Sequence, residues 1–282
     1  GGSSMGSAAA VAAGMLPLAF GTQTNGSVIR PAAFCGCVGF KPSEGTLATA
    51  GIQPFSPTLD QPGLFTRSVE DVALAFAALR EGPEDLRNEV WPLLPLDRPP
   101  RLATVRSPMW PQAEPAAQQS FVATLARLRA AGAEITETEL PAVFASARGV
   151  HRTIMAYEAA RALGDLQSQQ RAQLSAVLNR FLDEGHTIGA AAVAEALAQR
   201  QTLQAEFGTF ITGFDAIVTP PVRGEAPATL EHTGDPVFCT IWTLLGVPAL
   251  TLPAGFGPRS LPLGLQVVGM FQDDAHLLSV AR

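Results

Sequence analysis

The sequence opens on GGSSMGSAAAVAAG (residues 1–14) and, after a short apolar segment, continues with GTQTNGSVIRPAAFCG (residues 21–36). The alanine-rich run in the first stretch favours a helix, which Gly14 is expected to end. The apolar residues 16–20 predict a short buried strand. The glycine and asparagine residues that follow are typical of a tight turn into a second helix. The chain is therefore expected to begin as turn, helix, strand, turn and helix.

Ser27 lies in the turn of the second stretch, before residues 28–35, which can form a helix because Pro31 is tolerated in a first helical turn. Backbone amides of this turn can converge on one point, where the helix dipole would help to stabilise an oxyanion. These amides belong to Thr24, Asn25, Gly26 and Ser27. A serine at this position can also be an ordinary helix N-cap, and the GGSS start can be a linker or an expression remnant.

A histidine-dependent catalytic triad is not indicated around Ser27. The chain contains four histidines, and none lies in a recognisable catalytic motif; they are His151, His186, His232 and His276. The residues that flank Ser27 also lack the glycines of the G-x-S-x-G nucleophile elbow. The sequence therefore disfavours a Ser-His-Asp triad.

The two opening stretches and VGFKP (residues 38–42) closely resemble the motifs of the amidase signature family of serine amidases. The resemblance implies a triad of serine, cis-serine and lysine. In that triad Ser27 is the acyl-forming nucleophile and Ser3, placed by a cis peptide bond after Gly2, relays the proton. Ser4 is expected to support this network, and the turn amides are expected to bind the oxyanion.

Lys41 is the only lysine in the sequence. The resemblance assigns Lys41 to the structural Lys-Pro motif of the family, whereas the family's catalytic lysine lies upstream of the GGSS motif. We therefore expect this chain to be incomplete at its N-terminus, to lack its terminal base, and to have little or no normal activity by itself. The alternative is that Lys41 serves as the base, since a buried lysine can be neutral and accept a proton.

Four positions depart from the common pattern of the family. Met5 stands where glycine is usual, Gln23 where an acidic residue is usual, and Asn25 where a small residue is usual. Arg30 stands one place later than expected. These differences leave both serines in place, but they leave open the detailed shape of the turn and with it the choice of substrate.

The rest of the chain predicts a single α/β domain over residues 1–282, with a mixed β-sheet surrounded by helices. An amphipathic helix is expected after Ser68, and residues 81–100 are expected to form a connection. Strand, helix and strand are predicted at residues 101–105, 116–131 and 132–138, which together form a parallel unit.

Residues 137–213 are expected to be a variable helical region on the substrate side, with a break near Gly185 and His186. The resemblance returns in three apolar segments that it implies to be strands, at residues 214–221, 246–255 and 261–269.

Composition excludes several classes of function. The formal net charge is −6 and no basic run occurs, so a nucleic acid partner is not expected. No apolar stretch reaches the roughly 18 to 20 residues of a membrane span. Three cysteines, an odd number, do not suggest a disulfide framework, and no spacing suggests a metal site. We expect a cytoplasmic enzyme without metal or cofactor. The sequence leaves open whether the protein forms a homodimer.

The expected reaction is the hydrolysis of a carboxamide C–N bond in a small-molecule amide through a serine acyl-enzyme, with release of ammonia or an amine. Two other functions stay open. The first is the glutamine-hydrolysing A subunit of a tRNA-dependent amidotransferase, which belongs to the same family. The second is a non-catalytic fragment or scaffold that retains the fold.

Overall fold

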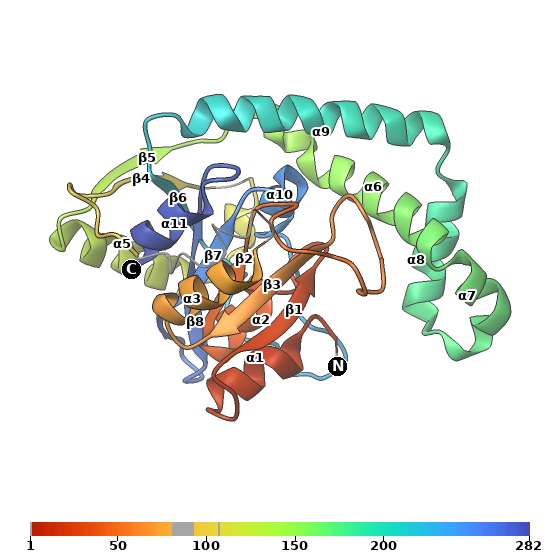
Figure 1. The fold of residues 1–282 in the computed structure, drawn as a ribbon, viewed down its shortest axis with the longest axis horizontal. Coiled ribbons are helices and arrows are strands. Elements are labelled where there is room, and N and C mark those ends of the chain that lie inside the picture. The colour runs from red at the N-terminus through yellow and green to blue at the C-terminus, as the bar shows by residue number, and fades with distance from the viewer. Residues whose placement is uncertain (1, 81–92, 107) are drawn as a thin grey trace.

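The structure is a computed structural model that describes residues 2–80, 93–106 and 108–282. An eight-stranded mixed sheet lies at its centre, with the strand order β1-β3-β2-β7-β8-β6-β4-β5 (Figure 1). The strands are β1 (Ala19–Gln23), β2 (Val38–Lys41), β3 (Gln61–Thr66), β4 (Arg101–Val105), β5 (Glu134–Thr138), β6 (Ala216–Thr219), β7 (Ala249–Phe256) and β8 (Pro262–Val268). The α/β class with a mixed sheet, predicted from the sequence, is confirmed.

Parallel pairing is confined to one end of the sheet. Strand β4 pairs in parallel with β5 and with β6, and the helix α5 (Pro115–Ala130) connects β4 to β5. The other neighbouring strands are antiparallel. The predicted unit of strand, helix and strand is therefore confirmed. Residues 81–92, most of the predicted connection, lie outside the described residues.

Side chains alternate between the two faces of the sheet, as the pleat of a strand requires. Leu102 packs on the face covered by α3 (Val69–Leu79), α5 and α11 (Asp274–Ala281). Its neighbour Ala103 packs on the opposite face. That face is covered by helices α2 (Ile29–Cys35), α6 (Ala147–Ala162), α9 (Ala190–Ile211) and α10 (Thr240–Leu245). The sheet is thus buried between two helical layers.

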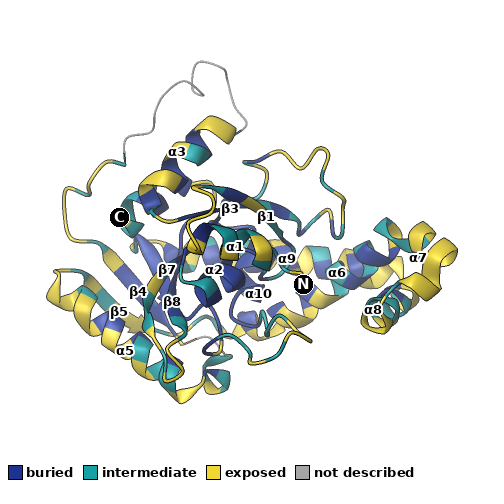
Figure 2. Ribbon diagram, turned by 90° about the horizontal axis from the view of Figure 1, so that it is seen from below, coloured by how far each residue is buried: buried dark blue, intermediate teal, exposed yellow. Residues whose placement is uncertain are grey.

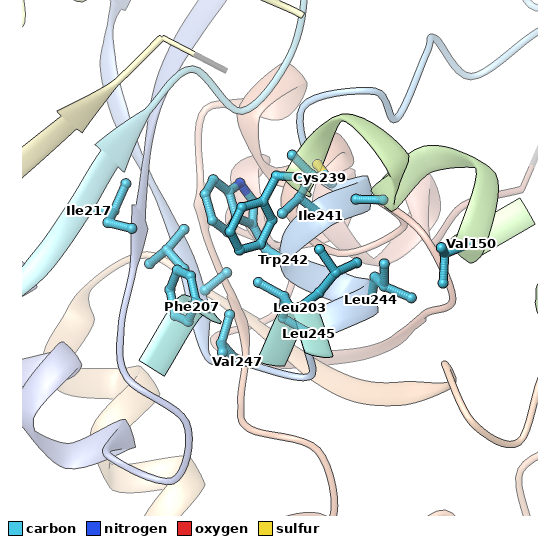
Figure 3. Packing of buried hydrophobic residues seen from close by; sticks show 14 of the residues in the cluster. Val150, Leu203, Phe207, Ile217, Cys239, Ile241, Trp242, Leu244, Leu245 and Val247 are labelled. Atoms are coloured by element: carbon cyan, nitrogen blue, oxygen red, sulfur yellow. The ribbon is translucent and has the colours of Figure 1, made fainter. Parts of the chain in front are cut away.

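Trp242 of α10 lies in the core of the second face, where it is 1% exposed. Its ring meets that of Phe207 from α9 at a centroid distance of 5.9 Å (Figure 3). Leu245 and Val247 pack in the same cluster. This packing holds α10 against the sheet, and α10 in turn contacts the turn that carries Ser27, as described below.

Two predicted boundaries differ from the structure. The first strand begins at Ala19 instead of residue 16, because its ladder with β3 starts where Ala19 pairs with Phe65. It then continues to Gln23, so the turn that precedes α2 is shorter than expected. Pro17 precedes the ladder and has no N–H to contribute to it.

The region predicted as helical, residues 137–213, is mostly helical from residue 142 onward, and a break follows the Gly185-His186 pair at residues 188–189. Helix α8 (Ala176–Thr187) runs through Gly185 and His186, and the chain leaves the helix at Ile188. A Cβ at position 185 would lie 2.0 Å from the backbone oxygen of Ala156 in α6. The glycine therefore allows α8 to pack closely against α6. Helices α7 (Gly164–Gln170) and α8 lie far from the sheet and are largely exposed (Figure 2).

Within the described ranges, no helix combines the length and the apolar character that crossing a bilayer would require.

Candidate active site

The two glycine-flanked serines meet at the start of α1 (Met5–Ala12) and of α2. Ser27 Oγ donates a hydrogen bond to Ser3 Oγ at 3.3 Å, although 24 positions separate the two residues in the chain. Helices α1 and α2 bring them together, because Ala8 and Val11 of α1 share a buried cluster with Ala32 of α2. The structure thus places the expected nucleophile and the expected relay serine in direct contact.

The backbone at Ser3 differs from the expectation. The cis peptide bond expected after Gly2 is absent, and no cis bond occurs in the residues that the structure describes. The chain reverses direction instead through left-handed backbone conformations at Ser3 and Ser4, with φ of 51° and 54°. Such conformations are uncommon for residues other than glycine.

The described hydrogen bonds of the Ser4 side chain go to β1 and not to Ser3 or Ser27. It precedes α1, but its side chain does not cap that helix. Its Oγ instead accepts a hydrogen bond from Thr22 N at 3.3 Å and donates to Thr22 O at 3.5 Å, which ties the first turn to β1. A Cβ at position 21 would lie 2.6 Å from Ser4 Oγ, so the glycine at that position permits the contact.

Arg30 reaches Ser3 from the first turn of α2. Its guanidinium donates to Ser3 Oγ at 2.5 Å and to Thr233 Oγ1 at 3.1 Å through Nη2, and to Gly234 O at 2.8 Å through Nη1. Arg30 is only 4% exposed, and burial lowers its pKa from the usual value. Because arginine stays protonated and has no acceptor atom, it orients the Ser3 hydroxyl but cannot accept its proton.

The turn between β1 and α2 is held by its carbonyl groups. Three consecutive carbonyls accept hydrogen bonds: Thr24 O with His151 Nε2 at 2.9 Å, Asn25 O from Thr243 Oγ1 at 2.5 Å, and Gly26 O from Arg30 N at 3.0 Å. In a planar trans peptide the N–H of the next residue points away from the carbonyl. Each bond therefore directs the N–H of the following residue away from the partner of its carbonyl.

Those N–H groups belong to Asn25, Gly26 and Ser27. Within the part of the chain that the structure describes, none of the three donates to a protein acceptor. Unpaired backbone donors beside a serine hydroxyl are the arrangement that binds a developing oxyanion. The amides of Asn25, Gly26 and Ser27, three of the four predicted, therefore stay candidate oxyanion donors.

Gln23 caps α2 in place of Ser27. Gln23 is fully buried, and its Oε1 accepts hydrogen bonds from Val28 N at 2.9 Å and from Ile29 N at 3.0 Å. Its Nε2 donates to Thr243 Oγ1 at 2.9 Å. Because the cap comes from Gln23, the hydroxyl of Ser27 is directed to Ser3, and the ordinary N-cap role considered for Ser27 is not what the structure shows.

Lys41 lies within the sheet, away from the serine pair. Its ammonium group donates to Val247 O at 2.6 Å, to Pro42 O at 3.1 Å and to the side-chain oxygen of Gln61. Burial lowers the pKa of Lys41 to about 7. Three acceptor oxygens match the three N–H donors of the charged form, and no described hydrogen bond links Lys41 to Ser3 or Ser27. This arrangement agrees with a structural role.

Three residues of the site were missed by the sequence analysis. His151 is 1% exposed, and burial lowers its pKa to about 4, so the ring is neutral at pH 7 and donates from Nε2. Thr243 and Thr233 complete the contacts of the turn and of Ser3. None of the three belongs to a local motif, and each lies more than 100 positions from its partner.

The described residues hold no cluster of potential metal ligands, and their cysteines are free thiols. No group of three or more His, Cys, Asp or Glu side chains among them could hold a metal ion. Cys37 and Cys239 are buried free thiols, and burial raises the pKa of both to about 12. Both thiols lie in buried apolar clusters.

Comparison with known proteins finds relatives over the whole chain. A family model described as Amidase matches residues 1–278. The A subunit of the glutamyl-tRNA(Gln) amidotransferase of Picosynechococcus sp. is 31% identical over 323 residues, with coverage of 100% of this chain and 67% of that protein. The corresponding protein of Lysinibacillus sphaericus is 33% identical, with coverage of 100% and 66%.

A solved structure described as a crystal structure of amidase superposes with a TM-score of 0.87 at 31% identity. The superposition covers 98% of this chain and 64% of that one. The chain therefore spans about two thirds of the length of the relatives it matches.

Proposed function

This chain belongs to the amidase family, and on that basis we propose that its serine pair hydrolyses a carboxamide C–N bond. The observation that carries the proposal is the contact of 3.3 Å between Ser27 Oγ and Ser3 Oγ, beside a turn with three unpaired backbone N–H groups. A hydroxyl nucleophile, a proton path and an oxyanion site are the parts that acyl transfer requires.

The reaction proceeds in two halves. Ser27 Oγ attacks the amide carbonyl while its proton passes to Ser3 Oγ and the proton of Ser3 moves on to an external acceptor. The carbonyl oxygen becomes an oxyanion that the turn amides bind. The C–N bond then breaks as the leaving nitrogen takes up a proton, which releases ammonia or an amine and leaves an ester on Ser27. Water hydrolyses the ester by the same proton path in reverse, and the serine is regenerated.

The proton acceptor behind Ser3 comes from outside these 282 residues in our proposal. Ser3 Oγ has three described partners, namely Ser27, Thr233 and Arg30, and none of them is a base at neutral pH. Lys41 is bonded elsewhere. We therefore expect the chain alone to hydrolyse amides slowly or not at all, and a longer polypeptide that contains it to be active.

A fluorophosphonate probe tests the nucleophile. In an active preparation, the probe is expected to modify Ser27, as located by mass spectrometry, and Ser27→Ala is expected to remove the label. Ser3→Ala is expected to slow labelling by about 10²-fold or more, since positioned proton transfer contributes on that order. Lys41→Met is the control and should leave the labelling rate of folded protein unchanged. Labelling that persists in Ser27→Ala would refute the proposal.

A second candidate is the hydrolysis of glutamine within a tRNA-dependent amidotransferase. The relatives in two bacteria, at 31% and 33% identity, are A subunits of such an enzyme, and this observation favours it. Glutaminase activity that requires added partner proteins would support this candidate. Hydrolysis of other small amides without partners would support a stand-alone amidase, and an active-site probe that never reacts would support a non-catalytic scaffold.

A further inference from the structure

We propose that His151 is a positioning residue, which orients the oxyanion-binding turn by holding the carbonyl of Thr24. The proposal rests on the proposed function, because the turn has a catalytic task only if Ser27 is acylated. It assigns to α6, in the variable helical region, a direct part in the geometry of the serine site.

The hydrogen bond between His151 and Thr24 fixes the orientation of the peptide plane between Thr24 and Asn25. His151 Nε2 lies 2.9 Å from Thr24 O, and the imidazole is almost completely buried. A carbonyl can only accept a hydrogen bond, so the ring must carry its proton on Nε2. With the Thr24 carbonyl held in this direction, the N–H of Asn25 points to the other side of the turn, where it is unpaired.

The side chain of the same threonine is held as well. Thr24 Oγ1 donates to a carboxylate oxygen of Asp60 at 2.5 Å. The other oxygen of Asp60 accepts from Phe55 N at 2.7 Å and from Ser56 N at 2.9 Å. Thr24 is therefore fixed at two atoms, its carbonyl by α6 and its hydroxyl by the loop around residues 55–60. This double attachment opposes rotation of the peptide between Thr24 and Asn25.

Helix α6 also forms hydrogen bonds with the loop around residues 55–60. Glu158 lies seven residues after His151, about two helical turns, and so projects from the same face of α6. Its carboxylate accepts hydrogen bonds from Ser56 Oγ at 2.6 Å, from Thr58 N at 3.0 Å and from Thr58 Oγ1. Helix α6 extends from the sheet to α7 and α8 (Figure 1). The helical region thus reaches Thr24 by one direct and one indirect route.

A packing role for His151 makes a different prediction from a positioning role. A histidine that only fills the core can be replaced by leucine with a change in stability and no specific effect on acylation. A positioning histidine must donate a hydrogen bond, so a shorter or apolar side chain should disturb the turn, while an amide of similar reach should restore it. The test compares these side chains at one position.

The experiment uses His151→Leu, His151→Asn and His151→Gln, with His186→Leu as the matched control. His186 also lies in the helical region, but its Nε2 contacts Gln167 Oε1 at 3.1 Å and not the turn. We expect His151→Leu and His151→Asn to lower the Ser27 labelling rate and kcat by about tenfold or more, with KM changed much less, because donors of an oxyanion hole act mainly in the transition state. His151→Gln should recover most of the loss.

Equal labelling rates in wild type, His151→Leu and His186→Leu would overturn the inference. It would also be overturned if His151→Gln, at the thermal stability of wild type, labelled as slowly as His151→Leu. If Ser27 is not labelled even in a preparation that hydrolyses amides, the proposed function fails, and NMR then tests the inference separately. The wild-type ring should show the Nε2–H tautomer at pH 7, and His151→Gln should preserve the Asn25 amide resonance that His151→Asn shifts. The Nδ1–H tautomer in wild type, or an unshifted amide in His151→Asn, would overturn it even if His151→Leu does not fold.

Discussion

At the scale of single residues, Gly185 sets how closely α8 approaches α6. A Cβ at this position would lie 2.0 Å from Ala156 O and 2.7 Å from Ala160 Cβ. The first neighbour is backbone of another helix, which cannot move aside as the end of a flexible side chain would. Any side chain at position 185 must therefore push the two helices apart.

Gly185→Ala is expected to lower the free energy of unfolding by about 1 to 3 kcal/mol, the usual cost of overpacking. Gly208→Ala is the matched control, because Gly208 lies inside α9 with open space around the position of a Cβ. That change should be neutral or stabilising by up to about 1 kcal/mol, since alanine is the better helix former. Urea unfolding measures both, and equal effects of the two substitutions would contradict the prediction.

Glycine at position 185 also shows where a local pattern is ambiguous. A Gly-His pair near the end of a helical run reads as a helix break, because glycine is a poor helix former. In the structure α8 ends at Thr187, directly after this pair, while Gly185 itself lies within the helix, where the contact with α6 requires the missing side chain. Only the neighbouring helix reveals this reason for the glycine.

At the scale of elements, the start of α2 depends on a residue from the preceding strand. Gln23 ends β1, accepts two hydrogen bonds from the first amides of α2 and donates one to Thr243 of α10. The end of β1, the start of α2 and the helix α10 are thus joined through one side chain. The turn between β1 and α2, which carries the candidate nucleophile, is closed by this contact.

Gln23→Leu should lower the free energy of unfolding by about 1 to 3 kcal/mol, because it leaves the amides of Val28 and Ile29 without their buried acceptor. Labelling of Ser27 should slow as well, since the turn loses its cap. Gln53→Leu makes the same chemical change at an exposed glutamine whose Nε2 contacts only Pro54 O, and it should be close to neutral. Thermal unfolding and labelling rates that are unchanged in Gln23→Leu would contradict this account.

The predicted elements were confirmed where a local pattern specifies them. Helix α3 begins after Ser68, whose Oγ accepts from Asp71 N at 3.1 Å as an N-cap should. Strands β4 and β5 flank α5 as predicted. Element boundaries were less accurate at β1, because strand ends depend on the partner strand and not on hydropathy alone.

At the scale of the whole molecule, Asp215 ties three distant segments together. Its carboxylate accepts two hydrogen bonds from the Arg98 guanidinium at 2.6 Å and one from Arg101 N at 2.7 Å, at the entry to β4. His276 of α11 lies 3.3 Å from the same carboxylate. The hydrogen bonds from Arg98 are the main reason that the pKa of Asp215 falls to about 2.

This depressed pKa predicts a stability loss in acid. Between the usual pKa of 3.8 and about 2, the unfolded chain binds a proton at Asp215 that the folded chain does not. The stabilisation is therefore fully present above the usual pKa of 3.8 and is lost as the pH falls toward 2. Asp215→Asn should remove this part of the pH dependence of urea unfolding.

Asp183→Asn is the control, since Asp183 pairs with Arg171 at an exposed site where solvent screens the interaction. It should change the acid dependence much less than Asp215→Asn does. An acid profile of Asp215→Asn that runs parallel to that of wild type would contradict the assigned role.

The sequence by itself determined the local elements, the family and the two glycine-flanked serines, because helix periodicity, turn residues and motif spacing act over a few neighbouring positions. Only the tertiary structure decided how the site is assembled. His151 meets the turn across 127 positions and Thr243 across 218, while Arg30 reaches Ser3 only because α1 packs on α2. Such contacts depend on how elements pack. The residues next to a buried polar side chain in the sequence do not indicate which distant group will bond to it.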